Sequence, residues 1–209
     1  QDGPVSADLI SYIFNIEKNW ENINIIRNKD NKGFAFSLNR LIDTAIDFKD
    51  YEYIARMDGD DVARRSRIRR QVEHMENERD ISVCGTWARE FGSVFAVDKK
   101  ILPMLHDDLV DYSVARCPFI HPSVMFRASL FADQIRYPLI HLDEDMGLWY
   151  ALILAGHRLS NVPEVLIDFR INDGTILRRK ARGPFNDFKM RYIFLKKSKK
   201  MTAFNLVMI

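Results

Sequence analysis

Hydrophobic and polar positions along this 209-residue chain repeat with two periods, which predict helices and strands in turn. Apolar residues spaced three or four apart predict helices over residues 6–20, 34–48 and 65–78. Short runs rich in β-branched and aromatic residues predict strands over residues 23–28, 51–57 and 81–92. This alternation indicates an α/β layered domain with a mostly parallel central sheet.

The predicted helices also indicate which side chains face the core. Ser6 is predicted to be the N-cap of the first helix. The Gly/Pro turn before it has no strand ahead of it, so we expect an N-terminal strand to be missing. In the second and third helices the inward positions are Phe36, Leu38, Leu41, Ile42, Ala45, Ile68, Val72 and Met75. Further along, Leu148, Trp149 and Leu152 are expected in the core.

Composition limits the class of protein. A hydrophobic content of 47% and a charged content of 29% suit one globular domain and argue against disordered and fibrous classes. The apolar runs are shorter than the roughly 18 residues of a membrane-spanning helix, and the first residues do not resemble a signal peptide, so we expect a cytoplasmic protein. Cys84 and Cys117 fit no CxxC pattern and are expected to be buried thiols without chemistry.

Charge is unevenly distributed along the chain. Residues 178–200 carry +9, which leaves −7 for the rest of a chain whose net charge is +2. This basic arm (residues 178–200) interleaves its charges with Phe185, Phe188, Tyr192, Ile193, Phe194 and Leu195. An anionic membrane surface suits such a segment. Nucleic acid is the less favoured partner, because the chain has no known nucleic-acid module and its remainder is negative, and a solvated helix is a third interpretation.

A cluster of carboxylates, Asp58, Asp60 and Asp61, follows the predicted strand 51–57. Ligands of α/β sheets bind outside the carboxyl ends of strands, which is where this acidic loop (residues 58–61) falls. A divalent cation, Mg²⁺ or Mn²⁺, would hold three mutually repelling carboxylates together and contact substrate phosphates. The alternative is a charged surface turn neutralised by the arginines that follow it.

Four segments in order resemble a known family. "YEYIARMDGDD" followed by "RIRRQV" resembles the DxD region of family 2 glycosyltransferases with the GT-A fold, and "HPSVMFRASLF" resembles their His-Pro-Ser segment. "DEDMGLWYALILAG" is similar to the family's Glu-Asp helix, and "QDGPVSADLI" to its Asp-Gly-Ser turn. The match covers about residues 1–171 and is nearest to bacterial enzymes that build O-antigen, capsule or exopolysaccharide. It implies a GT-A domain over residues 1–177, followed by a basic amphipathic segment over residues 178–209.

The resemblance implies how a nucleotide-sugar donor, most simply a UDP-sugar, would be bound. Asp2 resembles the carboxylate that hydrogen-bonds the base. Asp58 and Asp60 correspond to the ribose and the phosphate/metal region, and Asp61 to the residue most directly on the metal. Mg²⁺ or Mn²⁺ is the implied cofactor.

It also implies the acceptor side of the reaction. Asp145 matches the catalytic base of inverting members, although an acid in the first turn of a helix can also serve only the helix dipole. Glu144 would bind the acceptor, which is implied to be a lipid-linked glycan, or would orient Asp145. His121 would lie beside the sugar, although a His-Pro pair can also be purely structural, and Arg170 would face the diphosphate. A non-catalytic nucleotide- or polyanion-binding module is the alternative, and it would have no need of Asp145.

The chain departs from the family pattern at two further places. Arg64 and Arg65 stand where the family usually carries proline, so we expect either a looser loop or a loop that contacts phosphate itself. Gly147 stands where an acid is common.

Overall fold

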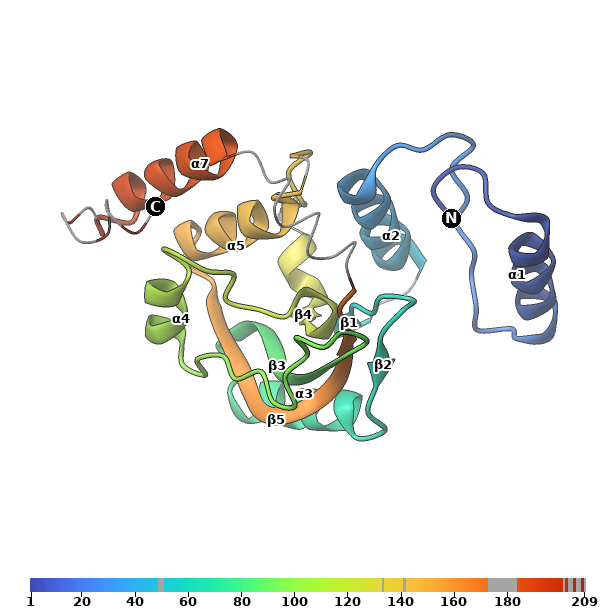
Figure 1. Ribbon diagram of the computed structural model, residues 1–209, viewed down its shortest axis with the longest axis horizontal. Helices are drawn as coiled ribbons and strands as arrows, with labels where there is room; N and C mark the ends of the chain where they lie inside the picture. Colours follow the sequence, from blue (N-terminus) through green and yellow to red (C-terminus); the bar gives the residue numbers. More distant parts are fainter. Residues whose placement is uncertain are drawn as a thin grey trace.

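One mixed sheet organises the chain in the computed structural model, which describes residues 1–48, 51–132, 134–140, 142–172 and 184–200, with residues 202, 205 and 208 (Figure 1). Its strands, in their order across the sheet, are β1 (Tyr53–Ala55), β4 (Met125–Arg127), β3 (Ile81–Phe91), β5 (Arg158–Arg170) and β2 (Val62–Ala63).

The long central pair of strands is parallel. β3 and β5 pair from Ile81 opposite Arg158 to Phe91 opposite Arg170. β4 is antiparallel to both β1 and β3, so β1, β3 and β5 run in one direction, and β2 is antiparallel to β5. The predicted α/β fold is confirmed, with its parallel core flanked by short antiparallel strands.

Helices precede, connect and follow the strands. They are α1 (Ala7–Asn19), α2 (Phe34–Phe48), α3 (Arg67–Asn77), α4 (His106–Tyr112), α5 (Glu144–Leu154) and α7 (Pro184–Lys197), with 3-10 turns η1 (His121–Ser123) and η2 (Ala128–Phe131). The predicted N-cap is confirmed, because the N–H of Leu9 donates to Ser6 Oγ. α1 has no buried residue, and Figure 1 shows it at the end of the molecule beyond α2.

The two faces of the sheet hold separate parts of the core. Successive side chains of a strand point to opposite faces, and β4 illustrates this, because Met125 packs in a cluster with Met75 of α3 whereas Phe126 packs with Trp149 of α5. α7 lies against α5, where the rings of Tyr150 and Phe194 stack with centroids 4.0 Å apart. Leu148, Trp149 and Leu152 are fully buried, as predicted.

The predicted strand over residues 23–28 is wrong. The structure has only an isolated parallel bridge between Asp2 and Asn28 in this region. Extending that ladder would need regular extended residues after Asp2, but Gly3 has φ +85° and Pro4 has no N–H to donate. The apolar run therefore forms an irregular connection.

Two predicted helix faces are also partly wrong. Phe36, Leu41 and Ile68 are exposed, and the buried rows run through Ala35 and Ile42 of α2 and through Arg67, Gln71 and Met75 of α3. α3 turns its polar residues inward because their side chains satisfy buried backbone carbonyls: Arg67 Nη2 donates to Arg56 O at 2.7 Å, and Gln71 Nε2 donates to Ser123 O at 2.9 Å. The spacing of apolar residues cannot predict such hydrogen bonds between buried polar side chains and the backbone.

The described part of the basic arm has an inner and an outer face. Phe194 and Leu195 lie in the core, so these two residues cannot face a lipid surface as expected. The outward residues are Phe188, Lys189, Tyr192, Ile193, Lys196 and Lys197. Residues 178–183, the side chain of Phe185 and the expected boundary at residue 177 lie outside the described residues. In the described ranges, we find no helix long and apolar enough to cross a membrane.

Candidate active site

A cleft of about 1370 Å³ lies beside the acidic loop. Its walls come from the start of α2, the loop between β1 and β2, the η1 turn and the first turn of α5. Among the side chains that line it are Phe34, Arg56, Asp58, Asp60, Cys117, His121, Glu144 and Asp145. The cleft therefore brings together groups separated by more than a hundred residues of sequence.

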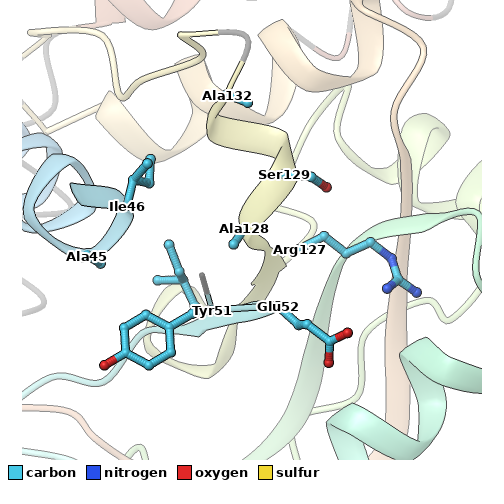
Figure 2. A pocket seen from close by; sticks show the side chains of 9 residues that line it. Ala45, Ile46, Tyr51, Glu52, Arg127, Ala128, Ser129 and Ala132 are labelled. Atoms are coloured by element: carbon cyan, nitrogen blue, oxygen red, sulfur yellow. The ribbon is translucent and has the colours of Figure 1, made fainter. Parts of the chain in front are cut away.

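A second hollow of about 480 Å³ has different walls. Figure 2 shows it between Ala45 and Ile46 of α2 and the η2 segment that carries Ala128 and Ala132. Of the side chains predicted for catalysis or binding, none of those the structure describes lines it. We place the candidate site in the larger cleft, where the carboxylates gather.

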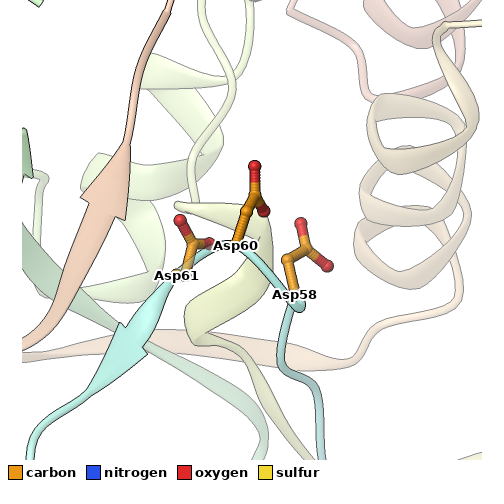
Figure 3. Close-up of side chains that lie close together, drawn as sticks. All are labelled: Asp58, Asp60 and Asp61. Atoms are coloured by element: carbon orange, nitrogen blue, oxygen red, sulfur yellow. The ribbon is translucent and has the colours of Figure 1, made fainter. Parts of the chain in front are cut away.

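The three carboxylates of the acidic loop converge. One oxygen from each of Asp58, Asp60 and Asp61 lies within 4.8 Å of the others, and Figure 3 shows the side chains pointing to the same side of the loop. β1 precedes the loop, and β2, which pairs with β5 through Val62 and Asp168, follows it. Both ends are thus fixed by the sheet.

Asp61 carries the clearest sign of an incomplete environment. Its Oδ1 accepts the backbone N–H of Arg170 at 2.7 Å, while its Oδ2 is buried without a hydrogen-bond partner among the described residues. Burial, with the charges of Asp58 and Asp60 adding to it, raises the pKa of Asp61 to about 6. A buried carboxylate oxygen without a donor fits a hard divalent cation, and the all-oxygen set suits Mg²⁺ or Mn²⁺.

Arg170 closes the acidic loop from the end of β5. Besides the N–H bond to Asp61, its Nε donates to the carbonyl oxygen of Asp60 at 2.9 Å, and its guanidinium lies 4.4 Å from the ring centroid of Phe91. The structure thus brings Arg170 to the acidic loop. Arg64, which could have contacted phosphate, instead forms a 2.7 Å ion pair with Asp168.

Asp58 pairs with an arginine that sequence reasoning missed. Arg56 Nη2 lies 2.7 Å from Asp58 Oδ1. Burial raises the pKa of Asp58, and the charge of Arg56 opposes this rise. Arg56 is part of the quoted segment "IARMDGDD", but nothing in its spacing marks it as a site residue.

His121 lies in an aromatic wall of the cleft. Its Nε2 is 2.9 Å from the hydroxyl of Tyr137, and its ring meets Trp149 edge to face with centroids 5.7 Å apart. Burial first, and the charge of Arg56 second, hold the pKa of His121 well below its usual 6.5. The imidazole is therefore neutral at physiological pH.

We expect His121 to lower the free energy of unfolding as the pH drops below about 6.5, by the uptake of up to one proton on unfolding. The unfolded imidazole protonates near pH 6.5 while the folded one stays neutral, so acid favours the unfolded chain. The slope is up to about 1.4 kcal/mol per pH unit. Urea titrations at pH 7.5 and 5.5 should show a smaller difference in the free energy of unfolding for His121→Phe than for the parental protein. An equal pH dependence in the two proteins would contradict this assignment.

Asp145 lies in the first turn of α5, on a different wall of the cleft from the acidic loop. It is 9% exposed, lines the cleft and accepts the N–H of Met146 at Oδ1 over 2.8 Å. Cys117 donates its thiol toward Asp145 Oδ2 across 3.6 Å, a contact that the sequence did not reveal. Glu144 beside it is half-buried and also lines the cleft.

Cys84, unlike Cys117, is fully buried, and burial raises the pKa of its thiol to about 12, as expected of an unreactive thiol.

Gly147 follows Asp145 and is explained by packing. A Cβ added at Gly147 would lie 2.4 Å from Cγ of Pro138. The segment before α5 therefore crosses the helix closely, next to Tyr137, which bonds to His121. An acidic side chain, which the family often has here, would not fit without moving Pro138.

Asp2 holds the backbone of two residues that line the cleft. Its Oδ1 accepts the N–H of Lys32 at 2.8 Å and its Oδ2 accepts that of Gly33 at 2.9 Å. These bonds, with that of Lys32 contributing most, lower the pKa of Asp2. Lys32 and Gly33 line the cleft, whereas Asp2 is outside the described lining.

Comparison with known proteins agrees with this geometry. The Glycosyl transferase family 2 profile matches residues 2–132. The amylovoran biosynthesis glycosyltransferase AmsE of Erwinia amylovora is 28% identical over 183 residues, which are 86% of this chain and 66% of AmsE. The UDP-Gal:alpha-D-GlcNAc-diphosphoundecaprenol beta-1,3-galactosyltransferase of Escherichia coli is 27% identical over 197 residues, which are 93% of this chain and 70% of that protein.

Solved structures share the fold. The mannosyltransferase PcManGT of Pyrobaculum calidifontis, in complex with GDP-Man and Mn²⁺, superposes with a TM-score of 0.59 at 13% identity. The superposition covers 96% of this chain and 54% of that one, so this chain spans about half of its length. The GT-A fold expected from the sequence is confirmed.

Proposed function

This chain belongs to glycosyl transferase family 2, and from that premise we propose that it transfers a sugar from a nucleotide-diphosphate donor to a glycan acceptor during assembly of a bacterial surface polysaccharide. The observation that carries the proposal is one cleft that has Asp58, Gly59 and Asp60 of the acidic loop on one wall and Asp145 on another. The two curated relatives described above, which are named for amylovoran biosynthesis and for a galactosyl transfer, support the same class of reaction.

The acidic loop is proposed as the cation and diphosphate site. Asp61 and Asp60 would hold Mg²⁺ or Mn²⁺, in line with the unpartnered Asp61 Oδ2 and with the Mn²⁺ of the Pyrobaculum mannosyltransferase. When bound, such a cation neutralises the charge that develops on a diphosphate leaving group. Arg170, which is bonded to the loop, would add positive charge on the same side.

The remaining donor contacts are proposed from position. Asp58, at the start of the loop, would lie near the ribose, and His121 would present a neutral ring edge to the sugar. Asp2 would act on the nucleoside side, where it fixes the backbone of Lys32 and Gly33. A UDP-sugar is the simplest donor for this arrangement, as the name of the Escherichia coli relative suggests.

Asp145 is proposed as the general base. Its carboxylate would take the proton from the acceptor hydroxyl as that oxygen attacks the anomeric carbon. The new C–O bond forms as the bond to the diphosphate breaks, so a single displacement inverts the anomeric configuration. Glu144 at the cleft wall would bind a second hydroxyl of the acceptor.

The test is a mass-spectrometric screen of nucleotide sugars with the purified protein and Mn²⁺. We expect one donor to be hydrolysed slowly without acceptor, and the hydrolysis to stop with EDTA. Binding of nucleotides without any turnover, with or without glycan acceptors, would instead support the non-catalytic module.

We further propose that the acceptor is lipid-linked and that the protein works at the cytoplasmic face of the membrane. The Escherichia coli relative is named for a diphosphoundecaprenol acceptor. The outer face of α7 supports membrane contact, because exposed Phe188, Tyr192 and Ile193 alternate there with lysines.

Anionic vesicles should therefore bind the protein and release it at high salt, because screening weakens attraction between lysine and lipid charges. Cosedimentation should fall by about tenfold or more for the triple change of Lys189, Lys196 and Lys197 to glutamine, at about 1 kcal/mol per charge. The charge-matched control changes the exposed Arg65, Arg69 and Arg79 to glutamine. Equal binding by both triple variants would contradict a role for α7.

A further inference from the structure

Arg56 is a buried arginine at the cleft with donors that lack acceptors. It directly follows β1, is 9% exposed and lines the cleft. Its backbone is fixed, since its N–H donates to Val124 O at 2.9 Å. Of its guanidinium nitrogens, Nη2 pairs with Asp58, whereas Nε and Nη1 are buried without a hydrogen-bond partner in the described parts of the chain.

Arg67 shows what a buried structural arginine looks like in the same region. It is 1% exposed, and each of its three nitrogens has a partner. Nε donates to Gln71 Oε1 at 2.9 Å, Nη1 to the sulfur of Met57 at 3.2 Å and Nη2 to Arg56 O at 2.7 Å. Every guanidinium nitrogen of Arg67 thus has a partner in tying α3 to the end of β1, whereas two nitrogens of Arg56 have none among the described residues.

The surroundings of Arg56 favour an anion. Its guanidinium carbon lies 5.2 Å from the ring centroid of Phe34, a cation–π contact on one face of the group. His121, the next polar ring, is neutral and carries no counter-charge. Buried N–H donors of a charged group are costly when unpaired, and they are strong when an anionic oxygen meets them.

We propose that Arg56 binds an anionic oxygen of the donor through Nε and Nη1. The inference rests on the proposed function, which makes a nucleotide-diphosphate sugar the occupant of the cleft. Two sources share this chemistry: an oxygen of the diphosphate, or the carboxylate of a uronic acid as the transferred sugar. Asp58 holds the guanidinium from the other side, so the group is oriented before the donor arrives.

The experiment measures affinity by calorimetry at saturating Mn²⁺, with inorganic pyrophosphate, UDP-glucose and UDP-glucuronate as probes. Arg56→Gln should weaken binding of the responding probe by about 10- to 100-fold, as expected for a lost charge-assisted hydrogen-bond pair. Mn²⁺ affinity itself should stay or tighten, because a positive charge beside Asp58 is removed. Arg69→Gln, at an arginine exposed on α3, is the matched control and should change nothing.

The probes separate the two sources. Weaker pyrophosphate binding assigns Arg56 to the diphosphate, and a loss confined to UDP-glucuronate assigns it to a sugar carboxylate. If Arg56→Gln does not fold, Arg56→Lys replaces it, because a lysine keeps the charge but cannot present the paired Nε and Nη1 donors, and a loss of affinity is again expected. Parental affinity for all three probes in a folded variant overturns the role of Arg56 alone. A parental protein that binds none of them overturns both this inference and the proposed function.

Discussion

Asp145→Asn is expected to lower kcat by about 100- to 10,000-fold while leaving donor affinity close to the parental value. Asparagine keeps the size of the side chain and an acceptor for the Met146 N–H, but it cannot take a proton. The loss corresponds to about 3 to 5 kcal/mol of activation free energy. Steady-state kinetics with the donor identified by the screen, together with calorimetry of the donor alone, would measure both quantities.

The matched control for Asp145 is Asp107→Asn. Asp107 also lies in the first turn of a helix, α4, but it is exposed and is not part of the described cleft lining. Its variant should retain full activity, which separates chemistry from a general effect on a helix dipole. Near-parental turnover by Asp145→Asn, or an NMR product spectrum with the donor's anomeric configuration retained, would remove Asp145 from the role of base.

Asp61→Asn is expected to abolish the dependence of donor binding on Mn²⁺ and to weaken binding at least about 100-fold. Loss of a supporting group around a metal already costs 10- to 100-fold, and Asp61 is proposed as the ligand itself. The variant should remain folded, because a neutral amide replaces a buried carboxylate whose pKa is already about 6. Its thermal midpoint without metal should equal or exceed the parental one.

Thermal shift and calorimetry would test the metal site together. Mn²⁺ should raise the unfolding temperature of the parental protein by mass action and leave Asp61→Asn unchanged. Asp98→Asn, at an exposed acid outside the acidic loop, is the control and should respond like the parental protein. Parental donor affinity in EDTA would rule out a cation at Asp61.

Local patterns were sufficient for α1, α2 and α3 and for the acidic loop. α1 and α2 carry regular apolar spacing, and Asp58, Asp60 and Asp61 are close in sequence, so neither required knowledge of the fold. The strand predicted over residues 23–28 failed because strand formation depends on a neighbouring ladder, which its own residues do not encode.

Properties that depend on distant partners could not be predicted from the sequence. Arg67 and Gln71 are polar, so periodicity assigned the inward face of α3 to Ile68, which is 51% exposed. Arg56 becomes notable only when its unsatisfied nitrogens are compared with the saturated ones of Arg67. Burial and bonding, rather than residue type, distinguish the two arginines.

The hydrogen bond from the Arg170 N–H to Asp61 has a consequence for folding during synthesis. The two residues are 109 positions apart, and the antiparallel pairing of β2 with β5 that brings them together joins Val62 to Asp168, which are 106 positions apart. Contacts of long sequence separation form late, because a large loop must close before they contribute. During synthesis, a nascent chain that has not yet emerged beyond residue 170 therefore lacks the hydrogen bonds from Arg170 to its acidic loop. The proposed cation site is therefore complete only after residue 170 has been synthesised.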